Sequence, residues 1–345
     1  MKKLVLFLLL AFALEQNASA QFKYDYGFRF GAANYLGDIG GKNLPRRDLV
    51  VDMHLPSTRW AVGGFIRKRK NKKLSFTSTF DYIRIQGTDQ LTTYFPRRAR
   101  NLTFKNDMFE LAARAEYTLY YDSDLSNQGY FNPDMKIYVF GGVAGLFSNP
   151  KGLMNYYAAR HYSRATGEDL EGQWIALRKY RTEGQDNIYS AFTFAVPMGI
   201  GMYFTYMKKW RVGWEYSWRM TFTDYLDDIS GSMPDPAVIN QSNPDDFPLL
   251  ESYIYYSYDE NYIGKKVGST FIPAETNPDG ILPANFGTSA ATGSPRGNPL
   301  NNDNYMTFQL YVSKVIRSKS NFYKSKYSWM RGRSGGGVRR AKIRF

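Results

Sequence analysis

Four aspartates are the most obvious candidates for metal chemistry in this chain. Asp224, Asp227 and Asp228 stand close together after one apolar stretch, and Asp38 follows another. Hard cations such as calcium bind clustered carboxylates, so Asp224, Asp227 and Asp228 form a weak calcium candidate. The segment lacks the glycine and ligand spacing of a defined calcium loop, and Asp at such positions also accepts from backbone N–H groups in a solvated turn. We therefore expect no metal site, with calcium as the alternative.

The rest of the composition leaves little room for catalysis. The 345 residues include no cysteine and two histidines, His54 and His161. The absence of cysteine excludes disulfides, cysteine-ligated zinc, iron–sulfur clusters and thiol catalysis. No Ser/His/Asp set and no Gly-rich phosphate loop can be assembled from the sequence. We predict that the protein is not an enzyme and has no cofactor.

Positive charge is concentrated in a few segments. The net charge is +14, and the tail 317–345 carries ten Lys/Arg and no Asp or Glu. Aromatic residues are interleaved with these charges, which suits a grip on an acidic protein surface. Peptidoglycan carboxylates are the alternative partner. The predicted partner-binding residues are Lys319, Phe322, Tyr323, Lys324, Lys326, Tyr327, Trp329, Arg331, Arg333, Arg339, Arg340, Lys342 and Arg344.

Two further basic groups lie in predicted connections. The first, 67–73, is expected at a membrane surface, where its side chains snorkel and pair with headgroups. The second, Arg97-Arg98-Ala99-Arg100, either grips lipopolysaccharide phosphates or is simply solvated.

The N-terminus assigns the compartment. Lys2 and Lys3 precede an apolar run from Leu4 to Leu14, and Ala18-Ser19-Ala20 gives a small-x-small cleavage pattern. This is typical of a signal peptide over residues 1–20, and the run is too short to span a bilayer as a helix. Export argues against a nucleic-acid partner, although the charge alone would suit one.

Period-two patterning predicts how the mature chain folds. In the clearest stretch, Trp210 to Phe222, large apolar residues alternate with Arg, Gly, Glu, Ser and Thr. A run of apolar residues of this length on one face matches the tilted strands of a membrane barrel, which face lipid outside and a polar lumen inside. A secreted β-sandwich usually has shorter apolar runs on one strand. We predict an all-β fold, a transmembrane antiparallel up-and-down β-barrel over 21–316.

Eight strands fit this pattern, and the connections between them alternate in length. The predicted strands are 23–36, 59–69, 73–85, 107–121, 135–147, 188–206, 210–223 and 304–316. The long connections are 37–58, 86–106, 148–187 and 224–303. Long extracellular loops opposite short turns put both termini in the periplasm, including the basic tail 317–345. The Tyr-rich stretch 253–258 leaves a hairpin above the membrane, or two further barrel strands, as alternatives.

The polar face of these strands carries charges of both signs. A barrel of eight strands has a lumen about filled by its own side chains, so these charges can pair across it. A plug of ion pairs is favoured over a channel lining. The predicted interior network is Arg29, Asp81, Glu110, Arg114, Glu116, Arg211, Glu215 and Arg219.

Three blocks carry a family resemblance. They are YLGD within 34–40, TEGQ within 181–185 and TDYLDD within 221–230. Together they resemble the PorG-like outer-membrane β-barrel family of the Bacteroidetes type IX secretion system, over about Phe22 to Ile316. The resemblance implies an integral outer-membrane protein docked to the periplasmic ring, a lipoprotein and its partner, of a secretion and gliding-motility machinery.

The sequence therefore predicts a non-enzymatic outer-membrane component of protein transport that anchors or docks a periplasmic ring complex through its tail. The expected partners are outer-membrane lipids and the ring proteins. The alternative is an adhesin or ligand-binding barrel that works through its extracellular loops, above all 224–303. A third class, a passive porin, would conduct ions.

Overall fold

The structure is a computed structural model, and it describes residues 22–40, 55–92, 95–122, 134–207, 209–257, 266–267, 270–271, 293 and 296–317. The predicted signal peptide and all the predicted partner-binding residues of the tail lie outside these ranges. Among the described residues, no helix has the length and apolar character to cross a bilayer.

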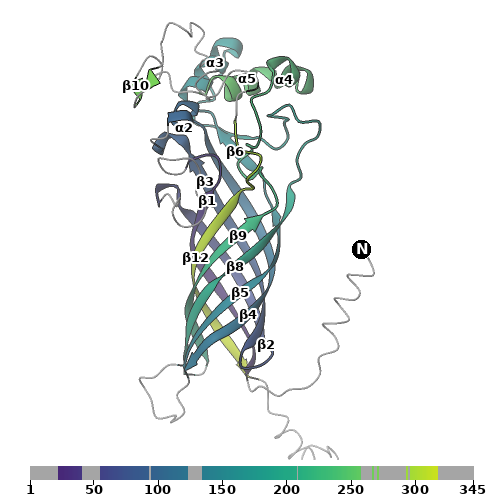
Figure 1. The fold of residues 1–345 in the computed structure, drawn as a ribbon. Helices are drawn as coiled ribbons and strands as arrows, with labels where there is room; N and C mark the ends of the chain where they lie inside the picture. The colour runs from purple at the N-terminus through teal and green to yellow at the C-terminus, as the bar shows by residue number, and fades with distance from the viewer. Residues whose placement is uncertain are drawn as a thin grey trace, which may run out of the picture.

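Eight long strands form a closed antiparallel barrel (Figure 1). Each strand pairs with the next one along the chain, and the last returns to pair with the first, Phe28 lying opposite Val312. The predicted eight-stranded antiparallel barrel is thereby confirmed. Its strands are β1 (Phe22–Leu36), β2 (Arg59–Arg69), β3 (Leu74–Thr88), β4 (Thr103–Asp122), β5 (Asp134–Phe147), β8 (Phe192–Tyr206), β9 (Trp210–Thr221) and β12 (Asn304–Arg317).

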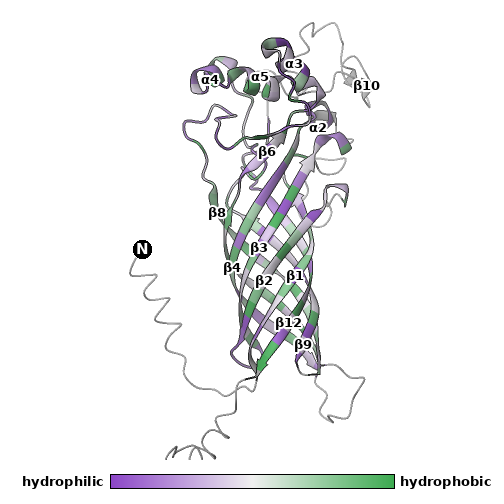
Figure 2. Cartoon of the chain, turned by 180° about the vertical axis from the view of Figure 1, so that it is seen from behind, coloured by the Kyte–Doolittle hydropathy of each residue, from purple (hydrophilic) through white to green (hydrophobic). Residues whose placement is uncertain are grey.

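The alternation of apolar and polar residues that predicted the strands also separates outward-facing from inward-facing side chains. On β1, Asp25 and Arg29 are buried, whereas Phe28 and Phe30 are 77% and 58% exposed on the outside. On β4, Glu110 and Arg114 are buried and Leu111 is 62% exposed. The barrel therefore has an apolar exterior and a charged interior. Hydrophobic and hydrophilic residues alternate along its strands (Figure 2).

The two ends of the barrel differ. At one end lie the start of β1, the end of β12 and the tight connections β2–β3 and β8–β9, where Arg69 pairs with Ser75 and Tyr206 with Trp210. We call this the turn end. All the helices within the described residues gather at the opposite, loop end (Figure 1). They are α2 (Phe95–Arg100), α3 (Tyr156–Thr166), α4 (Pro236–Ser242) and α5 (Phe247–Tyr255), with the 3-10 turns η2 (Leu55–Ser57) and η3 (Asp89–Leu91).

Short strands extend the wall at the loop end. β6 (Pro150–Leu153) pairs with the upper part of β4, and β7 (Trp174–Ala176) pairs with β6. A separate hairpin joins β10 (Lys266–Val267) and β11 (Thr270–Phe271). The elements above the barrel have an apolar core of their own, which continues into its upper interior through Ile83, Phe104 and Leu146.

The helices begin and end at residues that satisfy their free backbone groups. The Asn155 side chain accepts from Ala158 N at the start of α3, and Gly167 ends that helix in the left-handed conformation. Asp235 accepts from Ala237 N at the start of α4, and Pro236 occupies the first turn.

Two sequence predictions differ from the structure here. We call the helices and loops above the barrel the cap. The Tyr-rich stretch was expected as a hairpin or as barrel strands, but Tyr253 and Tyr255 lie in α5, and both rings are buried in the apolar core of the cap. Phe247 and Pro248 start a helix there, and tertiary packing outweighs the strand preference of tyrosine. Strand β8 starts at Phe192 and not at 188, because Ser190 Oγ exchanges hydrogen bonds with the Phe192 backbone and forms a local turn.

We predict that the seam between β1 and β12 is sensitive to side-chain size. A Cβ on Gly31 would overlap the backbone of Phe308 and Gln309, whereas a Cβ on Gly141 would meet nothing within 4 Å. Gly31→Val should therefore prevent barrel closure in most molecules, and Gly141→Ala should not. Heat-modifiable mobility in gel electrophoresis after refolding in detergent measures closure. Equal folded fractions for G31V and wild type would contradict the predicted seam.

Candidate functional site

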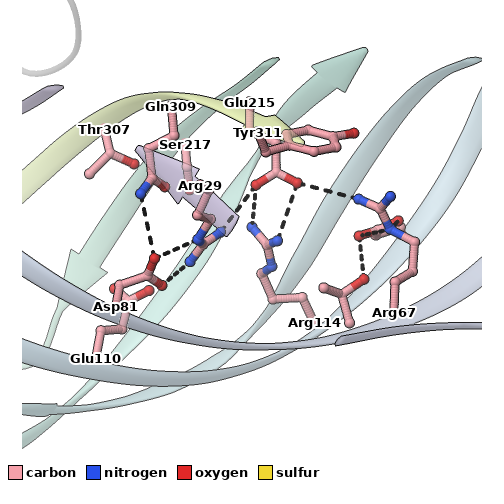
Figure 3. Close-up of polar contacts among 12 residues, drawn as sticks. Arg29, Arg67, Asp81, Glu110, Arg114, Glu215, Ser217, Thr307, Gln309 and Tyr311 are labelled. Carbon is pink, nitrogen blue, oxygen red and sulfur yellow. Dashed lines mark hydrogen bonds and ion pairs between the residues drawn. The ribbon is translucent and has the colours of Figure 1, made fainter. Parts of the chain in front are cut away.

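The candidate site is the charged interior of the barrel. Every second residue of each barrel strand points inward, so side chains from all eight strands meet in one narrow space. The structure places all eight predicted network residues there, each of them buried. Figure 3 shows Arg29, Asp81, Glu110, Arg114 and Glu215 of this set.

Glu215 of β9 is the centre of the network. Arg114 donates to it from both terminal nitrogens, Nη1 to Oε2 at 3.0 Å and Nη2 to Oε1 at 3.2 Å. Arg29 Nη1 reaches Oε2 at 3.2 Å, and Tyr138 Oη donates to Oε1 at 2.6 Å. Arg67 Nη2 lies 3.7 Å from Oε1. One carboxylate thus faces three guanidinium groups from three other strands.

Two further ion pairs lie between this centre and the loop end. Arg29 also binds Asp81 through a bidentate contact, and Gln309 Nε2 reaches the same carboxylate at 3.4 Å. Arg219 Nε donates to Glu110 Oε2 at 2.9 Å. These contacts connect β1, β3, β4, β9 and β12 across the lumen.

Below the centre, Arg67 and Arg211 share the carboxylate of Asp25. Arg67 Nη1 lies 3.2 Å from Oδ2, and Arg211 Nη1 lies 2.5 Å from Oδ1. Arg67 Nε also pairs with Glu116 at 2.8 Å. The guanidinium of Arg67 lies near the rings of four aromatic residues, about 5 Å from each centroid. They are Phe65, Tyr138, Tyr203 and Tyr311.

Several members of the network were missed from the sequence. Arg67 was assigned to a basic turn at the membrane surface, but it is 1% exposed inside the barrel. The alternation of inward and outward positions along β2 places Arg67 inside the barrel and could have identified it. The neighbouring basic residues suggested a surface turn instead. Asp25 and the tyrosines Tyr138, Tyr305 and Tyr311 were also missed; Tyr305 Oη donates to Glu110 at 2.6 Å. Tyrosine on an inward position reads as apolar in a hydrophobicity pattern, although its hydroxyl needs a partner.

Carboxylates also fasten the loop end, and we call this set the cap carboxylates: Asp38, Asp89, Asp227, Asp228 and Asp303. Asp227 accepts from Ile39 N at 3.1 Å and from Ile229 N at 2.9 Å. Asp303 accepts from Tyr35 Oη at 2.6 Å and from Leu226 N at 3.0 Å. These bonds tie loops from distant parts of the chain to one another.

The calcium candidate gains no support from this arrangement. Both carboxylate oxygens of Asp227 accept from backbone N–H groups, and Asp228 Oδ1 accepts from Tyr189 Oη. In the described part of the chain, no three His, Asp or Glu side chains form a group that could hold a metal ion. The structure shows the backbone-capping role that was the alternative for Asp227.

Two arginines of the basic segment 97–100, Arg97 and Arg100, bind to other parts of the cap. Arg100 Nε donates to Asp89 Oδ2 at 2.8 Å, and its Nη2 donates to Asp38 O at 2.8 Å. Arg97 donates to Gly40 O and is buried. For Arg97 and Arg100, both sequence interpretations, a lipopolysaccharide grip and a solvated loop, are therefore wrong.

His161 is part of the cap packing. Its ring stacks on Tyr256 with centroids 3.5 Å apart, and its Nδ1 lies 2.9 Å from Ser252 Oγ. Ser252 is fully buried and donates to Pro248 O, as expected for a helix residue that bonds back onto its own turn. This pair holds α3 against α5.

Burial raises the pKa of three cap carboxylates, those of Asp227, Asp228 and Asp303. Desolvation raises the pKa of Asp228 to about 7, although Arg296 lies 3.8 Å away and Tyr189 Oη donates to it at 2.6 Å. Desolvation and neighbouring carboxylates also raise the pKa of Asp227 and of Asp303 well above the usual range. Asp227, Asp228 and Asp303 thus keep their protons to a higher pH than exposed aspartates do.

Comparison with known proteins gives one family match. The family model described as Domain of unknown function (DUF6089) matches residues 2–166. No curated protein matches the chain.

Solved barrels show distant likeness. Neisserial surface protein A is 9% identical, with 87% of this chain and 100% of that chain covered and a TM-score of 0.33. Ail, the attachment invasion locus protein of Yersinia pestis, in complex with the heparin analogue sucrose octasulfate, is 8% identical, with 85% and 99% covered and a TM-score of 0.31. The N-terminal β-barrel domain of Pseudomonas aeruginosa OprF is 8% identical, with 86% and 98% covered and a TM-score of 0.30.

Removing the charge of Glu215 should destabilise the barrel strongly. Glu215→Gln leaves three buried guanidinium groups with less compensation, and breaking a buried pair costs about 3–5 kcal/mol. The free energy of unfolding from lipid vesicles in a urea series measures this loss. The exposed Glu168→Gln is the matched control and should change stability by less than about 0.5 kcal/mol. Equal effects of the two variants would contradict the central role of Glu215.

The cap should lose stability as pH rises, through Asp228. In the folded chain this carboxyl stays protonated up to about 7, whereas the ordinary aspartate value is 3.8. The folded state binds more protons between these values, so its advantage falls as pH rises through this window. Asp228→Asn keeps the shape and suits the left-handed backbone, φ 72°, at this position. Unfolding free energies at pH 4 to 8 should fall more steeply for wild type than for D228N; parallel curves would contradict the assignment.

Proposed function

We propose that this protein is an integral outer-membrane β-barrel that serves as a non-enzymatic, non-conducting anchor for a periplasmic ring complex of a type IX-like protein secretion and gliding machinery. The observation that carries the anchor role is the lumen, in which ion-paired side chains from β1, β2, β3, β4 and β9 meet. A barrel filled in this way suits attachment better than transport through its own interior.

The exterior supports insertion in a membrane. Phe28, Leu111, Phe194 and Val312 lie on four different strands and are all exposed. An apolar band of this kind around a closed barrel matches the lipid-facing surface of outer-membrane barrels. In a bilayer no water is available for backbone groups, and closure through β1 and β12 satisfies them within the sheet.

The two ends support one orientation. The turn end carries Lys68, Lys70, Lys72 and Lys73 in and beside the first connection, and both β1 and β12 start or finish there. Short turns and chain ends face the periplasm in outer-membrane barrels, and long loops face outward. The basic tail beyond Arg317 then continues into the periplasm.

The three blocks that carry the family resemblance lie together in the cap. Ile39 of the first block donates to Asp227 of the third at 3.1 Å. Glu183 of the second accepts from Ser230 N of the third at 3.0 Å and pairs with Arg296 at 3.3 Å. Segments far apart in the sequence thus form one structural unit, and this supports reading them as one family signature and not as three chance similarities.

The secretion role is tested by binding of the ring proteins to the tail. The full chain in detergent should retain the ring lipoprotein and its partner on an affinity column, and a chain ending at Arg317 should lose most of this binding, because opposite charge and aromatic contacts are removed together. Lys72→Gln with Lys73→Gln is the matched control, since it removes charge at the same end and leaves the tail intact. Undiminished binding of the ring proteins by the truncated chain would contradict the docking role of the tail. Binding of the full chain to purified peptidoglycan alone would support the alternative partner.

The adhesin alternative has one structural observation in its favour. Helices α3, α4 and α5 form an ordered cap at the loop end, with exposed side chains such as Tyr156 and Val238. Deleting residues 258–292 leaves these helices and the cap carboxylates in place. Loss of surface attachment by cells with intact secretion would favour the adhesin, whereas the anchor role requires that secretion, and not attachment, depend on the protein.

A further inference from the structure

A group of charged and aromatic side chains lies on the outer wall just above the apolar band. We call it the outer-rim patch, and its members come from β2, β3, β4, β6 and β7. They are Trp60, Arg84, Lys105, Asp107, Lys151 and Trp174.

Strand register stacks the patch directly on the band. Across the wall, Val62 pairs with Tyr82, Tyr82 with Phe109, and Phe109 with Phe147. The next outward row toward the loop end includes Arg84 opposite Asp107, and the row beyond it includes Lys105 opposite Lys151. Successive outward rows are about 7 Å apart along a strand. The wall therefore changes from aromatic to cationic within two rows.

The single acid of the patch is already neutralised. Asp107 Oδ1 accepts from Arg84 Nε at 2.5 Å and from Tyr82 Oη at 2.6 Å. The Arg84 guanidinium also lies 5.6 Å from the Trp60 ring centroid. The patch thus presents one internal ion pair and two ammonium groups.

Lys105 and Lys151 are the unbalanced charges. Lys105 Nζ lies 4.0 Å from the Trp174 ring centroid, and within the described part of the chain neither ammonium has an ion-pair partner. Two lysines in facing positions repel each other unless an anion lies between them. Their side chains are half-buried on the wall, so an anion there would be shielded in part from water.

The surface next to the outer-rim patch, on its turn-end side, is apolar. Phe109 and Phe147 are 45% and 51% exposed, and Phe80 and Leu111 continue the same face toward the turn end. A ligand that satisfied both levels would need an anionic group above and apolar chains below.

We infer that the outer-rim patch binds a phosphorylated lipid of the external leaflet, with its phosphate between Lys105 and Lys151 and its acyl chains on the apolar band. The inference rests on the orientation given under the proposed function, which puts the loop end outside. Lipid A chemistry fits, because a sugar phosphate carries several acyl chains close to its charge. The ring of Trp174 stacks beside the ammonium at headgroup level, where aromatic side chains are enriched in membrane proteins.

Free phosphate fits the site less well. Inorganic phosphate would use the two ammonium groups but not the apolar rows below them. A soluble acidic protein would have to approach a wall that is covered by lipid up to the row of Phe109 and Phe147. Charge complementarity and the adjoining apolar face together therefore select an amphiphile.

The test is calorimetric titration of the full-length protein, in zwitterionic detergent micelles, with lipid A that carries two phosphates. The double variant Lys105→Gln with Lys151→Gln should raise the dissociation constant about tenfold or more, since two charge-assisted contacts to phosphate are lost. The matched control Arg164→Gln with Lys179→Gln removes the same charge from exposed loop-end positions and should bind as wild type does. Dephosphorylated lipid A should bind wild type as weakly as intact lipid A binds K105Q/K151Q.

Three results would overturn the site: unchanged binding by K105Q/K151Q, equal binding of dephosphorylated lipid A, or competition by inorganic phosphate at the affinity of the lipid. The single variant Lys151→Gln leaves the Lys105–Trp174 contact in place and should weaken binding by a smaller factor, which keeps the test available if the double variant does not fold. Normal insertion into vesicles without phosphate-dependent binding would contradict this site alone. Failure of the wild type to insert would contradict the proposed membrane anchor itself.

Discussion

Pairing of β1 with β12 is the constraint on which the rest of the structure depends, because it turns an open sheet into a closed wall. In a bilayer an open edge would leave a row of backbone N–H and C=O groups without partners. Closure with eight strands fixes a narrow lumen, and inward side chains must then touch across it. Below the outer-rim patch the exterior can be apolar, because closure leaves the barrel no open sheet edge that faces lipid.

The charged lumen follows from that narrowness. Arg29, Arg67 and Arg114 each need a carboxylate within a few ångströms, and Glu215 provides it for all three. Buried ion pairs add little net stability over well-packed apolar residues, but losing one partner is costly. The ion pairs contribute to the choice of strand register. A slip of one residue on β1, β2, β3, β4 or β9 would turn a buried charge toward the lipid and bring an apolar side chain inside. The ion pairs thus select one alignment of strands.

Much of the barrel could be predicted from the sequence, because a period of two along a strand separates lipid-facing from lumen-facing residues locally. That pattern identified eight strands and an interior set from Arg29 to Arg219, all of which the structure buries. It could not identify partners, since Arg29 and Glu215 lie on strands far apart in the chain. It also missed Arg67, whose basic neighbours suggested a surface turn.

The cap was harder to predict for a different reason. Its order comes from long-range bonds such as Ile39 N to Asp227 and Asn298 N to Asp38, which leave no periodic trace in the sequence. The clustered aspartates left calcium open as an alternative to backbone capping, and Asp227 accepts from the backbone N–H of Ile39 in another loop. The helix over 247–255 contains tyrosines with strand preference, and its buried face decided the outcome.

The central claim, that the lumen is filled by its own ion pairs, is tested most directly by electrical recording. Purified full-length protein is inserted into planar lipid bilayers, and insertion is verified by the heat-modifiable mobility of protein recovered from matched vesicles. A filled eight-stranded barrel predicts a membrane current that stays at the baseline of the protein-free bilayer across the voltage range. Stable, stepwise ohmic conductance from the wild-type protein would contradict a sealed interior and would make the protein a pore.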